Sequence, residues 1–151
     1  MAQPFTLQPL LELMQTRTDE ATRKLGQLIA AEQNAKSRLQ MLEQYREEYA
    51  QRLRDATAQG ITQQTLRNYQ DFLARIDEAV AQQRAAVQAS EKSTAAGQEY
   101  WKAQNKRLKA IDTLSVRHDA RERYRENKHD QKLQDEFSTR KFGGEKPPEV
   151  D

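Results

Sequence analysis

The segment that decides the fold, residues 38–80, reads RLQMLEQYREEYAQRLRDATAQGITQQTLRNYQDFLARIDEAV. On both sides of Gly60 it is highly charged and free of proline, and apolar residues recur every three or four positions, which is typical of helices. The segment DATAQGITQQT, residues 55–65, is the one place between Pro9 and Pro147 where such a chain can reverse direction. Glycine tolerates the left-handed backbone that ends many helices, and the Thr62 hydroxyl can cap the next helix. The sequence therefore predicts two helices joined by a tight turn at Gly60.

Outward from this turn, apolar residues follow intervals of three and four over most of the chain, as in a coiled coil. Before the turn the series is Leu7, Leu11, Met14, Thr18, Ala21, Leu25, Leu28, Glu32, Ala35, Leu39, Leu42, Arg46, Tyr49, Leu53 and Ala56. After the turn it is Leu66, Tyr69, Leu73, Ile76, Val80, Gln83, Val87, Ser90, Thr94, Gly97, Trp101, Gln104, Leu108 and Ile111. We therefore predict an all-α fold, a long antiparallel two-helix coiled coil (helical hairpin) with a C-terminal helical overhang.

The expected boundaries follow from the same pattern. A helix should span about residues 6–57, a turn about 58–62 and a second helix about 63–140, all within one domain over 1–140. Residues 141–151 contain paired glycines and prolines and are expected to be a disordered tail. Residues 1–5 are expected to be a loose lead-in to the first helix.

The register of the two helices can also be predicted. An antiparallel coiled coil layers a positions of one helix against d positions of the other, which restricts the register to values one heptad apart. The register that centres the turn beside Gly60 sets Leu25 against Gly97 and Ala21 against Trp101, a large residue facing a small one each time. A shift by one heptad is the alternative.

The apolar series ends at Leu114. Its continuation would meet Ser115, His118, Glu122, Arg125 and His129. The first helix is long enough to cover the second only to about residue 115, so residues 116–140 are expected to be a charged helical overhang without a partner.

The composition argues against several classes of function. The 151 residues are 32% charged and 36% hydrophobic, which is typical of a long helix rather than a layered core. There is no cysteine, and no phosphate-binding loop or catalytic motif is recognisable. His118 and His129 lie three turns apart and are expected to be solvated rather than metal ligands. We therefore expect no enzymatic activity, no cofactor and no metal, and, without a targeting or membrane-spanning segment, a cytoplasmic protein.

A basic run, RHDARERYRENKHDQK, occupies residues 117–132. The whole chain has 25 Lys and Arg against 23 Asp and Glu, so no overall field favours nucleic acid or a membrane. Acidic residues also share the run, and a solvated helix with alternating charges is the leading interpretation. Among functional interpretations, docking to an acidic protein surface ranks above nucleic-acid binding.

An apolar strip beside the turn is the most informative feature of the surface. Tyr45 and Phe72 both occupy g positions, which flank the same side of the seam in an antiparallel hairpin. Ala79 and the edges of seam residues would widen them into one partly exposed strip. A contiguous apolar strip with tyrosines favours a binding interface over simple edge packing.

Three separated segments carry a resemblance to a known family: RLQMLEQYREEYAQRL, GI followed shortly by NYQDFLARIDEAV, and ENKHDQKLQDEF. Together with the chain length and the position of the turn, they resemble the FliJ family of flagellar export proteins. The resemblance implies a non-enzymatic component of the flagellar type III export apparatus, similar in fold to the stalk (gamma) subunit of rotary ATPases. The alternative is a generic adaptor or nucleic-acid-binding coiled coil that acts through its basic C-terminal helix.

The resemblance also implies partners and sites. The partners would be the hexameric export ATPase, the cytoplasmic region of the export gate protein and export chaperones. No nucleic acid is expected, and membrane contact at the cytoplasmic face of the inner membrane would occur only through partners. The implied gate-facing residues are Leu42, Tyr45, Tyr49, Phe72, Ile76 and Ala79, bordered by Arg38 and Gln83. The implied ATPase-facing end comprises Leu10, Met14, Arg17, Arg121, Tyr124 and Arg125.

Overall fold

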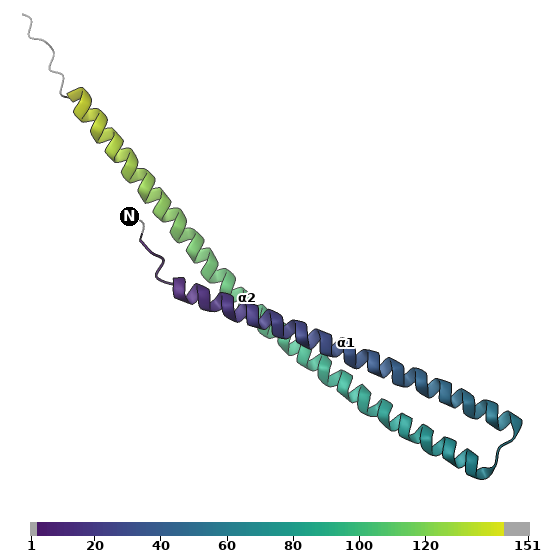
Figure 1. Ribbon diagram of the computed structural model, residues 1–151. Coiled ribbons are helices and arrows are strands. Elements are labelled where there is room, and N and C mark those ends of the chain that lie inside the picture. Colours follow the sequence, from purple (N-terminus) through teal and green to yellow (C-terminus); the bar gives the residue numbers. More distant parts are fainter. Residues whose placement is uncertain (1–2, 144–151) are drawn as a thin grey trace, which may run out of the picture. The chain divides into compact units, whose positions relative to one another are not determined.

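The structure is a computed structural model that describes residues 3–143. It contains two helices, α1 over Gln8–Gln59 and α2 over Gln63–Gly143, and the described residues include no strand (Figure 1). The predicted all-α helical hairpin is therefore confirmed. α2 continues to Gly143, inside the segment expected to be a tail, and the rest of that segment, 144–151, lies outside the described residues.

The turn has the geometry that its sequence predicts. Gly60 is the one described residue with a positive φ, at 89°, and its amide donates to the Thr57 carbonyl at 3.2 Å. No atom lies within 4 Å of the position that a Cβ would take, so the backbone conformation, rather than crowding, selects glycine here. Thr62 caps α2, because its Oγ1 accepts a hydrogen bond from the Thr65 amide at 3.2 Å.

The contacts within the chain define two compact units. One comprises residues 18–104 and contains the turn with the flanking parts of both helices. The other is formed by residues 1–17 together with 105–151, of which 3–17 and 105–143 are described.

In the unit of residues 18–104, α1 and α2 run side by side in opposite directions and pack along the predicted series (Figure 1). Ala21, Ile76, Val80 and Val87 are only 4–8% exposed and form its apolar centre. Every other position of the two series in this unit is buried or half-buried except Arg46. A narrow seam of this kind buries few side chains completely, as expected for two helices without a third layer.

Arg46 leaves the seam by extending its side chain into solvent. Its guanidinium forms an ion pair with Asp77 of α2. The hydrogen bond that the Arg46 guanidinium donates to Asp77 raises the pKa of Arg46 above its ordinary value. The arginine stem can therefore border the seam while the charge stays in water.

Contacts across this seam determine the register. A Cβ at Gly97 would lie 2.7 Å from Leu28 Cδ1 and 3.5 Å from Leu25 Cδ1, so the glycine faces both leucines. Trp101 Nε1 donates a hydrogen bond to Thr22 Oγ1 at 2.8 Å. Both contacts belong to the register predicted from the sequence, and a shift by one heptad is inconsistent with them.

In the second unit, the segment before α1 packs on α2, which corrects the expectation of a loose lead-in. The Gln3 amide donates to Glu122 Oε2 at 3.2 Å, and the Gln3 carbonyl lies 2.9 Å from His118 Nε2. The Phe5 ring is 5.4 Å from the His118 ring. Non-helical chain ahead of α1 therefore covers α2 as far as Glu122, which is 8% exposed, rather than to about residue 115.

The overhang begins later than predicted for the same reason. Every side chain of residues 123–141 is exposed, so the uncovered part of α2 starts after Glu122 and not at residue 116. His129 is exposed, as expected, whereas His118 is half-buried under the N-terminal segment and so is less solvated than predicted.

Candidate partner-binding surface

Four aromatic side chains gather beside the turn, two from each helix. The Tyr49 ring lies 4.6 Å from the Phe72 ring and 5.3 Å from the Tyr69 ring. The Tyr45 ring lies 6.3 Å from Phe72 in an edge-on arrangement and 6.4 Å from Tyr49. These separations and tilts are those of attractive aromatic pairs. The rings therefore form one continuous cluster.

The two helices hold this cluster on one side of their seam. Tyr45 and Phe72, both at g positions, are brought together from opposite helices, as the heptad pattern predicts. Tyr45 is 43% exposed, whereas Phe72 is half-buried between the two tyrosines of α1. Tyr45 is thus the accessible edge of the cluster and Phe72 its support.

The remaining residues of the strip differ in accessibility. Leu42, Tyr49 and Ala79 are half-buried and show part of their side chains to solvent. Ile76 is only 6% exposed, so it supports the strip from beneath and offers little surface of its own.

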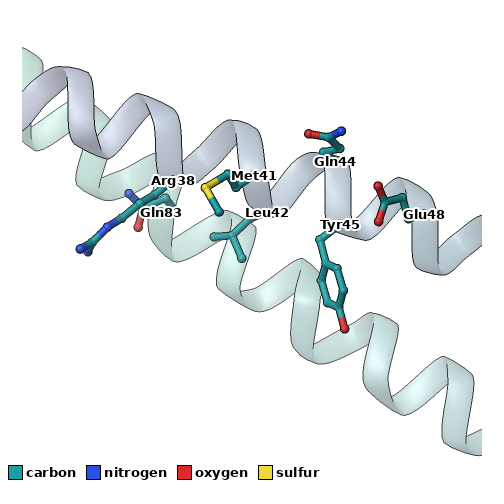
Figure 2. A pocket seen from close by; sticks show the side chains of 7 residues that line it. All are labelled: Arg38, Met41, Leu42, Gln44, Tyr45, Glu48 and Gln83. Carbon is teal, nitrogen blue, oxygen red and sulfur yellow. The ribbon is translucent and has the colours of Figure 1, made fainter.

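A shallow groove of about 700 Å³ continues the strip along α1. Its lining is Arg38, Met41, Leu42, Gln44, Tyr45, Glu48 and Gln83. Figure 2 shows Leu42 and Tyr45 directed from α1 toward α2, with Met41 beside Leu42 and Arg38 next to Gln83. Met41, which is 69% exposed, was not among the predicted residues, although an apolar residue one position before a seam residue is a usable signal.

The opposite side of the seam is polar at the same level. Glu43 and Asp77 occupy e positions there, and they pair with Arg84 at 3.1 Å and with Arg46, respectively. All four side chains are about half exposed, so these pairs contribute little stability. The contrast between an aromatic and an ionic side gives the hairpin one face suited to apolar contact with another protein.

The residues implied as an ATPase-facing end lie in the second unit. Met14 is 7% exposed and therefore packs within the helix pair, whereas Leu10 is 38% exposed and Arg17 is exposed. Arg121 and Tyr124 are exposed on α2, and Tyr124 reaches 68%. Gln3 is the residue that contacts α2 next to Arg121 and Tyr124, through its hydrogen bond to Glu122. Leu10 and Met14 therefore lie farther along the helix pair from Arg121 and Tyr124.

The basic run of α2 has one side that is free of acidic residues. Arg117, Arg121, Tyr124, Lys128 and Lys132 are three or four residues apart and share one side of the helix. The acidic residues of the run, Asp119, Glu122, Glu126 and Asp130, have the same spacing, and all but Glu122 lie two positions after a member of the basic side. Arg123 lies among these acidic residues. Two residues correspond to about 200° around a helix. The basic side is therefore continuous along residues 117–132, although acidic and basic residues alternate in the sequence.

Within residues 3–143, no group of three or more His, Asp or Glu side chains is placed to hold a metal ion. No helix in this part of the chain is both long and apolar enough to cross a membrane.

Nearly the whole chain is similar in sequence to known proteins. A family model described as "Flagellar FliJ protein" matches residues 3–146. The chain belongs to the FliJ family. Among curated FliJ proteins, that of Salmonella typhi is 33% identical over 140 residues, which cover 93% of this chain and 95% of the relative. The FliJ protein of Escherichia coli (strain K12) is 31% identical over the same shares. Membership in the FliJ family makes this chain a component of flagellar protein export.

Proposed function

We propose that this FliJ family member is a non-enzymatic linker between the flagellar export ATPase and the export gate in the inner membrane. In this proposal the aromatic strip beside the turn binds the cytoplasmic region of the gate protein. The exposed helical end around Arg121 and Tyr124 binds the ATPase, and export chaperones associate with the same assembly. The protein would then act in the cytoplasm, at the cytoplasmic face of the inner membrane, and reach the membrane only through partners.

The observation that carries the proposal is the aromatic cluster with its accessible edge at Tyr45. Aromatic residues are enriched at protein interfaces and often supply most of the binding energy. The cluster is rigid, because the rings pack on one another across two helices, so little conformational entropy is lost on binding. The adjoining groove adds the exposed Met41 side chain to the same surface.

A pair of matched variants tests this proposal. Tyr45→Ala removes the accessible ring, and Glu43→Ala removes a half-exposed side chain at the same level on the ionic side. Calorimetric titration with the gate's cytoplasmic region should show affinity reduced about tenfold or more for Tyr45→Ala and within about twofold of native for Glu43→Ala. Equal affinity of both variants and the native chain would contradict the proposed site.

A second candidate function rests on the continuous basic side of α2. Its cations could follow a phosphate backbone, as the nucleic-acid alternative requires. The overall charge balance of 25 cationic to 23 anionic residues speaks against this candidate. Binding to a nucleic acid would weaken steeply with added salt, whereas binding through the aromatic strip should change little.

A further inference from the structure

The uncovered end of α2 carries an exposed apolar pair, Leu133 and Phe137. Leu133 is 50% exposed and Phe137 is 69% exposed. Four residues apart, they lie on one side of the helix. Together with polar neighbours they line a shallow groove of about 580 Å³.

This pair lies on the continuation of a packed face. Steps of three or four residues lead from the covered Glu122 through Glu126 and Asp130 to Leu133 and Phe137. The side of α2 that packs under the N-terminal segment therefore continues beyond it, where every side chain over 123–141 is exposed. A helix face of this kind is suited to a second helix.

The charges beside the pair indicate which helix fits. Asp130 precedes Leu133 by three residues, Arg140 follows Phe137 by three, and both charged side chains are exposed on the same face. The spacing 130, 133, 137 and 140 is that of consecutive a and d positions. Reversing the segment end for end exchanges the two apolar residues with each other and the acid with the base. The segment is therefore complementary to an antiparallel copy of itself.

We propose that residues 130–140 of α2 form an antiparallel contact with the same segment of a second copy of this chain. Leu133 of each copy packs against Phe137 of the other, and Asp130 of each copy faces Arg140 of the other. Asp135 is the midpoint of the segment. It is two residues from both Leu133 and Phe137, so it lies on the far side of the helix and does not face Asp135 of the other copy. This contact goes beyond the proposed linker function and does not depend on it.

The contact is expected to be weak. Three turns of a helix pair bury less than the roughly 1,200 Å² of a stable interface. The native chain should therefore be monomeric at low micromolar concentration and associate toward dimers above about 100 µM.

Charge exchange in the full-length chain tests both the contact and its direction. Asp130→Arg places two cations opposite each other, and Arg140→Asp places two anions opposite each other, so each variant should dimerise about tenfold more weakly in sedimentation equilibrium. The double variant D130R/R140D restores both pairs and should return to within about threefold of native. An equimolar mixture of the two single variants should also associate better than either alone, because only the mixed dimer pairs opposite charges.

Phe137→Ala provides the apolar test, and helicity measured by circular dichroism verifies that α2 is retained in each variant. Loss of self-association in Phe137→Ala with unchanged helicity supports the proposal. A native chain that stays monomeric up to about 1 mM overturns it. Single charge variants that associate as strongly as native overturn it as well, because a parallel pair would not be affected by them.

Discussion

At the scale of single residues, the seam shows how a two-helix protein accommodates polar and small side chains. The Trp101 indole has a partner in Thr22 Oγ1, and Gln83 Nε2 donates to the Ala35 carbonyl at 3.0 Å. Gln104 differs, because it is 5% exposed and its Oε1 has no hydrogen-bond partner among the described residues. A buried acceptor without a donor lowers stability, since it has lost its hydrogen bonds to water.

Replacing Gln104 with methionine should therefore stabilise the protein. Methionine has a similar length and no amide to desolvate, so the free energy of unfolding should rise by about 1 kcal/mol. Urea denaturation followed by circular dichroism measures this change. Gln98→Met, at an exposed position of the same helix, is the control and should change stability by less than about 0.5 kcal/mol.

Three glycines should respond differently to substitution by alanine. At Gly26 nothing lies within 4 Å of a new Cβ, so alanine should add about 1 kcal/mol of helix stability. At Gly97 the same gain is offset, because the Cβ would meet Leu28 Cδ1 at 2.7 Å and the leucine must move. At Gly60 alanine should destabilise by about 1 kcal/mol, since φ is 89°. Thermal unfolding should rank the variants in this order, and a stabilising Gly60→Ala would contradict the turn geometry.

At the scale of elements, the sequence predicted the helices well and their ends less well. The heptad series identifies most of the buried and half-buried positions of both helices, because side-chain burial in a coiled coil follows directly from spacing. The cover over His118 and Glu122 could not be found in this way. It is made largely by the backbone of Gln3, which leaves no periodic signal, and the Phe5 ring alone hints at it.

This N-terminal cover should be measurable by hydrogen exchange. Removing residues 1–6 should speed exchange of the α2 amides over 115–122, because the packing that restrains local opening of this part of the helix is lost. Amides over 70–80, next to the turn, serve as the internal control and should keep their native rates. Unchanged exchange over 115–122 would mean that the segment contributes no protection.

At the scale of the whole molecule, the candidate surfaces sit on different units. The aromatic strip belongs to the unit of residues 18–104, and the exposed end of α2 belongs to the other. The strip was predictable because Tyr45 and Phe72 occupy flanking positions that the packed seam does not need. Met41 and the limited access to Ile76 were not predictable, since heptad position alone does not tell how far a side chain is covered.

The most direct test of the linker function is whether one chain holds both partners at once. Size-exclusion chromatography with light scattering, on a mixture of the native chain, the export ATPase and the gate's cytoplasmic region, should show a ternary complex. With Tyr45→Ala the ATPase complex should remain while the gate region elutes separately, because the substituted ring lies in a different unit from the proposed ATPase-binding end. A gate region that stays in the complex with Tyr45→Ala, or that displaces the ATPase from the native chain, would contradict the account.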